Sequence, residues 1–128
     1  MTPPTPHGIR SDAMGSGHYG ALRGARTHRG TDYICYPGEP VYSPISGLVV
    51  RESRPYTDTY SGLLIRNSQI ELKIFYFSPD LSLVGSYVKE GDAIGVAQDI
   101  SQKYGDAMTP HIHVQVEGVD PELLMVPK

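Results

Sequence analysis

The chain has 128 residues, 39% of them hydrophobic, which is enough for one domain with a buried core and too little for two. Its 11 basic and 14 acidic residues give a formal net charge of −3 without a basic stripe, so neither a nucleic acid nor an anionic membrane surface is an expected partner. The single cysteine, Cys35, excludes an internal disulfide and a cysteine-based zinc site, and we interpret it as a small buried hydrophobe.

The first residues of the chain are rich in proline, with Pro3, Pro4 and Pro6 close together. They contain no apolar h-region, so we expect residues 1–14 to be a loosely ordered leader and not a signal peptide. Residues 15–128 are expected to form one domain. No run of about 18 apolar residues occurs, so no membrane span is expected. If the protein acts outside a cell, we therefore expect a route other than a signal peptide to take it there.

A glycine-rich segment at residues 15–24 follows the leader and carries His18. Glycine lets a backbone pass close to other backbone or to a ligand. We interpret His18 as a loop residue that is hydrogen-bonded to backbone, in preference to a site residue, because neutral imidazole pairs readily with loop carbonyls.

Short β-strand patterns follow the glycine-rich segment. Strands are expected at residues 48–51, 63–65 and 72–77, and the last two, which a polar turn joins, are expected to be antiparallel neighbours. Residues 84–96 contain two strand stubs around a turn at residues 89–92, a hairpin of a kind also found in lipoyl and biotinyl carrier domains. The pattern predicts an all-β fold with little helix.

The last predicted strand, at residues 110–116, places two imidazoles on one face. Because successive side chains of a strand point to opposite faces, His111, His113 and Gln115 share one face, and the apolar residues that alternate with them share the other. One face can therefore pack in the core while the other presents ligands.

A second cluster lies upstream, where His28 and Asp32 flank Gly30, whose glycine lets the backbone bend. The two clusters together supply two imidazole nitrogens and one carboxylate oxygen, which is a catalytic zinc set with an open fourth position for water. Each signal alone is also compatible with an exposed polar pair or with chance spacing. Because zinc accepts such borderline ligands and both histidines of the strand face one way, we interpret the conjunction as a site for one zinc ion.

Three motifs occur along the chain: His28-x-Gly30-x-Asp32, Pro37-Gly38-x-x-Val41-Tyr42-x-Pro44-x-x-Gly47 and His111-x-His113. Together they resemble the lysostaphin/LytM-type zinc metallopeptidases, which cleave peptide cross-links in bacterial peptidoglycan. The resemblance implies a compact antiparallel β-sandwich with a groove over the zinc, and it implies that His28, Asp32 and His113 are the metal ligands. By the same resemblance His111 is a catalytic histidine close to the metal, which acts as acid and base on zinc-activated water.

One departure from the peptidase pattern lies at Ser78. The segments Gly17-x-Tyr19 and Phe75-Tyr76-Phe77-Ser78-Pro79 are similar to the branch of this family that contains a vertebrate leukocyte chemotaxin, a zinc-bearing binding protein. The peptidases carry a further histidine in a Tyr-x-His-Leu segment, and Ser78 stands at that position here. Tyr76 and His18 are candidates to supply the missing O–H or N–H donor.

The resemblance favours a zinc-dependent metalloendopeptidase that acts on peptidoglycan peptides or on other glycine-rich peptides. Two alternatives stay open. Ser78 favours a catalytically impaired zinc-binding recognition module, and the hairpin at residues 89–92 suggests a lipoyl- or biotinyl-type carrier domain. The His/Asp set has no function in a carrier domain and counts against that alternative.

Overall fold

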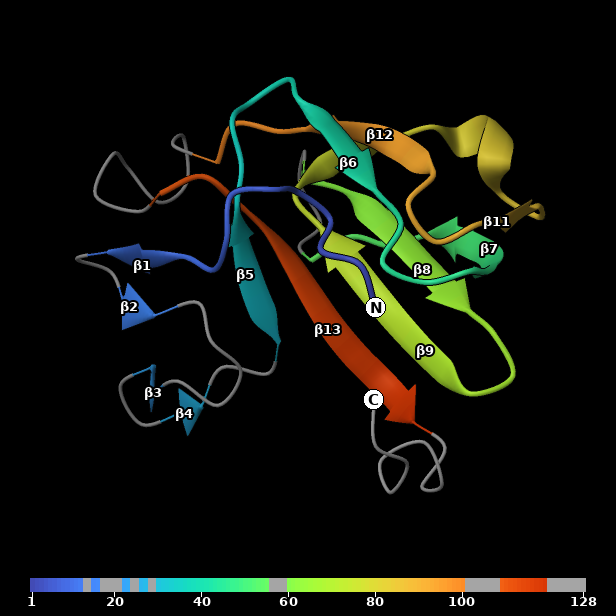
Figure 1. Ribbon diagram of the computed structural model, residues 1–128, viewed down its shortest axis with the longest axis horizontal. Helices are drawn as coiled ribbons and strands as arrows, with labels where there is room; N and C mark the ends of the chain where they lie inside the picture. The colour runs from blue at the N-terminus through green and yellow to red at the C-terminus, as the bar shows by residue number, and fades with distance from the viewer. Residues whose placement is uncertain are drawn as a thin grey trace.

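Nearly all of the regular structure is β-strand, which confirms the all-β prediction (Figure 1). The computed structural model describes residues 1–12, 15–16, 22–23, 26–27, 30–55, 60–100 and 109–119. Within these ranges the one helix is a single 3-10 turn, η1, at Leu81–Leu83. None of the described residues belongs to a helix that is long and apolar enough to cross a membrane.

A six-stranded antiparallel sheet forms the larger layer of the fold. Its strands, in spatial order, are β11 (Tyr87–Val88), β7 (Gly47–Glu52), β8 (Gly62–Arg66), β9 (Ile70–Phe75), β13 (His111–Val119) and β5 (Thr31–Ile34). The predicted antiparallel neighbours are confirmed as β8 and β9, with Leu63 opposite Ile74. Buried and partly exposed residues alternate along most of β9, as the two-residue period of a strand requires.

A three-stranded antiparallel sheet forms the second layer. Its strands, in spatial order, are β10 (Phe77–Pro79), β12 (Ala93–Ala97) and β6 (Pro40–Tyr42). Side chains of both sheets meet in one core cluster, which includes Val41, Phe77 and Ile94 of the smaller sheet and Val49, Leu63, Ile65, Leu72, Ile74 and Ile112 of the larger. Burial of one such side chain contributes about 1.5–3 kcal/mol relative to exposure, so this shared interior holds the two layers together.

Four two-residue strands precede β5 in the chain. They pair antiparallel as β1 (Ser11–Asp12) with β2 (Gly15–Ser16), and as β3 (Leu22–Arg23) with β4 (Arg26–Thr27).

The segment 84–96 is not the hairpin that the sequence predicts. β11 pairs with β7 in the larger sheet, whereas β12 pairs with β10 and β6 in the smaller one. The turn between them carries the chain from one sheet to the other, and it is closed by the Lys89 N–H, which donates to the Asp92 carboxylate over 2.8 Å. Each stub pairs with a strand that is distant in sequence, because only then do Val88 and Ile94 both reach the shared core.

The N-terminal segment, residues 1–10, makes backbone hydrogen bonds to β5. The Ile34 N–H donates to the Gly8 carbonyl, and the Arg10 N–H donates to the Asp32 carbonyl, both over 2.8 Å. The physical reason is that β5 is the last strand of its sheet, so its outer N–H and C=O groups need partners. This N-terminal segment supplies them and lies along β5 in Figure 1.

The Cys35 thiol is expected to resist modification in the folded protein. Cys35 is 1% exposed, and burial, assisted by the nearby Glu39 carboxylate, raises the pKa of its thiol to about 12. Relative to an ordinary cysteine, the reactive thiolate at pH 8 is then reduced on the order of a thousandfold. Titration with a chromogenic disulfide reagent should give no fast reaction without denaturant and one equivalent in denaturant. A fast equivalent from the folded protein would contradict the buried placement.

Candidate functional site

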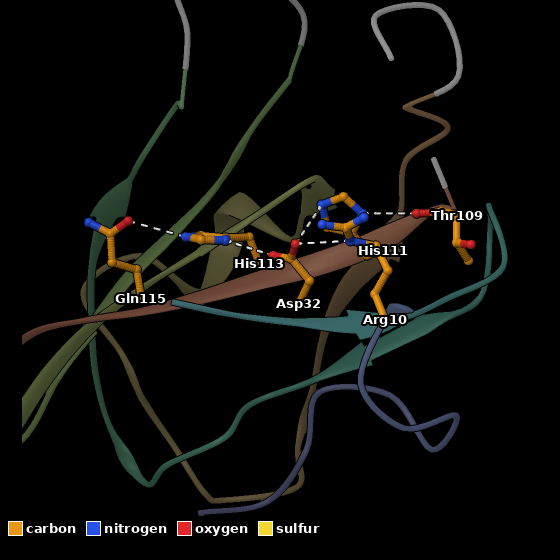
Figure 2. Close-up of polar contacts among 6 residues, drawn as sticks. All are labelled: Arg10, Asp32, Thr109, His111, His113 and Gln115. Atoms are coloured by element: carbon orange, nitrogen blue, oxygen red, sulfur yellow. Dashed lines mark hydrogen bonds and ion pairs between the residues drawn. The ribbon is translucent and has the colours of Figure 1, made fainter. Parts of the chain in front are cut away.

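The candidate site forms where β5 and β13 lie side by side. In the antiparallel register His113 is the Cα partner of Asp32, and His111 is the partner of Ile34. Residues two apart on one strand face the same way, so both imidazoles lie beside the Asp32 side chain. Asp32 Oδ1 is 2.8 Å from His113 Nδ1, and Asp32 Oδ2 is 3.4 Å from His111 Nε2. Figure 2 shows the carboxylate between the two rings. One strand pairing thus joins residues that are 81 positions apart.

Both ring nitrogens of His113 face acceptor oxygens. Its Nε2 is 3.1 Å from Gln115 Oε1, and the Gln115 amide is oriented by Glu117, whose carboxylate accepts from Gln115 Nε2 over 2.7 Å. A carboxylate only accepts, so this contact turns the amide oxygen toward His113 and places a hydrogen on His113 Nε2. The Nδ1 atom then faces Asp32 Oδ1, and a nitrogen lone pair and a carboxylate oxygen at 2.8 Å are held together by a proton or a metal cation.

The ring of His111 is held by a backbone carbonyl. Its Nδ1 is 2.9 Å from the Thr109 carbonyl oxygen, which can only accept, so Nδ1 carries the hydrogen and Nε2 is turned toward Asp32 (Figure 2). Burial lowers the pKa of His111, and the Asp32 carboxylate opposes this effect without reversing it. At neutral pH the ring is therefore uncharged, and its Nε2 can accept a proton.

Arg10 is a member of the site that sequence reasoning missed. Its Nε donates to Asp32 Oδ2 over 3.1 Å, and the side chains of Arg10 and Asp32 are 1% and 3% exposed. The sequence pattern predicts that Gln115 shares a strand face with His113, but it does not predict that Gln115 and Glu117 orient the His113 ring. An arginine in a proline-rich segment gives no sign that it is buried, so the sequence alone does not indicate that Arg10 belongs to the site.

Aromatic side chains form one wall beside the histidines. The Tyr76 ring contacts the His111 ring edge-to-face with centroids 5.4 Å apart, and the Phe75 ring stacks on His113 at 6.0 Å. Tyr76 has a φ of +78°, which is rare for a residue with a side chain, and its N–H donates to the Ser61 carbonyl over 2.8 Å. The structure thus places the predicted candidate Tyr76 next to His111, in a conformation that neighbouring backbone must hold.

Gly30 lies under the site for a reason of space. A Cβ atom built there would be 2.4 Å from the Val114 carbonyl oxygen and 2.8 Å from two atoms of the His113 ring. The sequence predicts Gly30 as a point where the backbone bends, whereas the structure shows that glycine lets β5 approach β13 closely enough for Asp32 to reach His113.

The structure describes only part of the predicted residue set. Asp32, His111, His113 and Tyr76 are brought together, whereas His28 and His18 lie outside the described residues. Ser78 is an exposed residue of β10. In the described ranges no group of three or more His, Cys, Asp or Glu side chains forms a complete metal site.

The two described members of the predicted ligand set fit a zinc ion. Asp32 Oδ1 and His113 Nδ1 are adjacent oxygen and nitrogen donors of the kinds that zinc binds. The Gln115 amide fixes the His113 tautomer that leaves Nδ1 as a donor to a metal, which is the usual arrangement for a histidine ligand.

Comparisons with known proteins identify the family of the chain. Residues 26–122 match the model of Peptidase family M23. Leukocyte cell-derived chemotaxin-2 of Mus musculus is 33% identical over 107 residues, which cover 81% of this chain and 69% of the relative. The Bos taurus protein of the same name is 30% identical over the same shares.

Solved structures of peptidases share the fold. The catalytic domain of the antimicrobial peptidase lysostaphin from Staphylococcus simulans is 25% identical, with a TM-score of 0.55 and coverage of 96% of this chain and 86% of that one. A solution structure of lysostaphin gives a TM-score of 0.56 at 24% identity; the match covers 91% of this chain and 45% of the longer one. The catalytic domain of the prophage-encoded M23 protein EnpA from Enterococcus faecalis, 21% identical, gives 0.59, with coverage of 92% and 91%. The family match, the two curated relatives and the shared fold together show that the chain belongs to peptidase family M23.

Proposed function

We propose that the protein is a zinc-dependent endopeptidase that cleaves peptide cross-links of bacterial peptidoglycan. Membership of a peptidase family supports the reaction class, and the resemblance to lysostaphin-type enzymes supports the substrate class. The single observation that carries the proposal is the polarity of the two imidazoles. His113 and His111 each commit one N–H to an acceptor, and each turns its other nitrogen toward Asp32.

The proposed zinc ligands are His28, Asp32 and His113. When bound, zinc supplies Lewis-acid chemistry, which polarises the scissile carbonyl and makes water a stronger nucleophile at neutral pH. His111 acts as the general base at Nε2 and returns the proton to the departing amine. Its Thr109 hydrogen bond fixes the ring in the required orientation, and its lowered pKa keeps it unprotonated before the reaction.

The wall formed by Tyr76 and Phe75 is expected to limit the size of the substrate. It also offers a replacement for the histidine that the peptidases carry at the position of Ser78. Tyr76 lies edge-on to His111, so its side chain is the described candidate for a second donor to the reacting carbonyl. His18 remains a candidate from the sequence alone. A site bounded by Tyr76 and Phe75 favours peptides with glycine or other small residues at the scissile bond.

The proposal is tested by incubating zinc-loaded protein with purified peptidoglycans of several cross-bridge types. New free amino groups are followed over time, and the released fragments are identified by mass spectrometry. We expect amines to appear with the wild-type protein and to be absent with Asp32→Ala. The fragments then name the bond that is cleaved.

A zinc-binding recognition module is the second candidate function. Two observations favour it: Ser78 stands where the peptidases carry a histidine, and two curated relatives are chemotaxins. In this case zinc binds with its full affinity, and no peptidoglycan releases amines. That pair of results would replace the endopeptidase proposal with a protein that binds a peptide or a glycan without turning it over.

A further inference from the structure

We propose that Arg10 is a positioning residue of the metal site: it holds Asp32 by Oδ2, so that Oδ1 stays turned toward His113 as a ligand. The inference rests on the proposed zinc site and adds to it a residue of the N-terminal segment. Figure 2 shows the arrangement, with Arg10 and His113 on different sides of the carboxylate.

The two carboxylate oxygens of Asp32 have different partners. Oδ2 accepts from Arg10 Nε over 3.1 Å, whereas Oδ1 is 2.8 Å from His113 Nδ1. Rotation of the carboxylate by less than a half-turn would break both contacts at once. Because Arg10 and Asp32 are almost completely buried, water compensates neither charge, and the contact between them stabilises both.

Backbone hydrogen bonding also holds Arg10 beside Asp32. The Arg10 N–H donates to the Asp32 main-chain carbonyl over 2.8 Å, so the same two residues are joined twice. One residue earlier, Ile9 forms an antiparallel bridge with Tyr33. The guanidinium is therefore fixed before any metal binds, and the site does not have to order it on binding.

The effect on metal affinity follows from this division of the oxygens. A carboxylate that ligates a metal through one oxygen is oriented by the hydrogen bond to its other oxygen, and loss of such partners weakens metal binding by about 10–100-fold. Arg10 carries a positive charge, which would repel a metal cation. The Asp32 carboxylate, however, lies between Arg10 and His113 and separates that charge from the His113 nitrogen. Lysine retains the charge but lacks the planar array of donors, so it replaces arginine only in part.

The test compares zinc dissociation constants, measured by competition with a chromogenic chelator, for the wild-type chain, Arg10→Met, Arg10→Lys and the control Arg51→Met. Arg51 is an exposed residue of β7. We expect Arg10→Met to bind zinc about 10–100-fold more weakly than wild type, Arg10→Lys to be intermediate, and Arg51→Met to be unchanged.

A second readout separates positioning from general stabilisation. Melting temperatures are measured with zinc and after chelation. Because a weaker ligand stabilises less, the increase on adding zinc should be smaller in Arg10→Met than in wild type. Equal losses in both conditions, with an unchanged dissociation constant, would assign Arg10 a purely structural role and overturn the inference.

The remaining outcomes are also decisive. Zinc binding that is tighter in Arg10→Met would show that Arg10 opposes the metal, and would overturn the inference. If Arg10→Met does not fold, Arg10→Lys decides, and a dissociation constant equal to that of wild type overturns it. Failure of the wild-type chain to bind zinc refutes the proposed zinc site itself, and this is measured before any variant.

Discussion

Replacing Asp32 with alanine is expected to remove zinc from the purified protein, whereas replacing His111 with alanine is expected to leave it bound. Asp32 supplies the oxygen donor beside His113, and His28→Ala should have the same effect because it removes another proposed ligand. His111→Ala removes only the general base, so turnover should fall by about 10²–10⁴-fold while zinc is retained. Metal analysis of the desalted proteins and an assay of amine release check both parts.

The Asp32 experiment needs a variant that keeps the shape of the side chain. In Asp32→Ala the buried Arg10 guanidinium loses its carboxylate, which costs about 3–5 kcal/mol and can itself unfold the protein. Asp32→Asn keeps the size and one oxygen, and near-ultraviolet circular dichroism reports whether the native packing remains. Loss of zinc from a folded His111→Ala would contradict the assignment and make His111 a ligand.

Gly30→Ala is expected to destabilise the protein and to weaken zinc binding together. The added Cβ would lie 2.4 Å from the Val114 carbonyl oxygen, so β5 and β13 must move apart. Forcing an extra carbon into a close contact of this kind costs about 1–3 kcal/mol. The same movement carries Asp32 away from His113. Urea denaturation and the zinc dissociation constant measure the two effects.

Gly47→Ala is the matched comparison. Its Cβ would lie 2.6 Å from the Arg66 carbonyl oxygen, between β7 and β8, where none of the proposed site residues lies. Its loss of stability should be comparable to that of Gly30→Ala, whereas the zinc affinity of the fraction that folds should be unchanged. Equal weakening of zinc binding in both variants would show that affinity follows global stability and not the β5–β13 contact.

Local periodicity was sufficient to predict β7, β8, β9 and β13 of the larger sheet, but the strand expected at residues 72–77 is divided at Tyr76 into β9 and β10, which lie in different sheets. The alternation along β9 and β13 is visible in the sequence, and the polar turn between β8 and β9 indicates their pairing. Pairings between distant segments were not predictable in this way. The strand at Tyr87–Val88 and the strand at Ala93–Ala97 join different sheets, because the outcome depends on which open edge each one meets and not on the turn that joins them.

The candidate site, like the fold, could be predicted from local sequence features only in part. Asp32, His111 and His113 were identified because their residue types and spacing fit a metal, and one strand register brings them together. Arg10 was not identified, because a buried arginine and a surface arginine give the same signal in a sequence. Its burial is decided by a tertiary contact with β5.

The N-terminal segment also has a consequence for the solubility of shortened forms of the protein. The family match begins at residue 26, and a protein trimmed to that point would lack the residues that hydrogen-bond to Ile34 and to the Asp32 main chain. The outer edge of β5 would then be bare. Bare strand edges recruit strands from other molecules and lead to aggregation. Residues 8–10 therefore protect the edge of the sheet, and they keep each molecule from adding its strands to those of another.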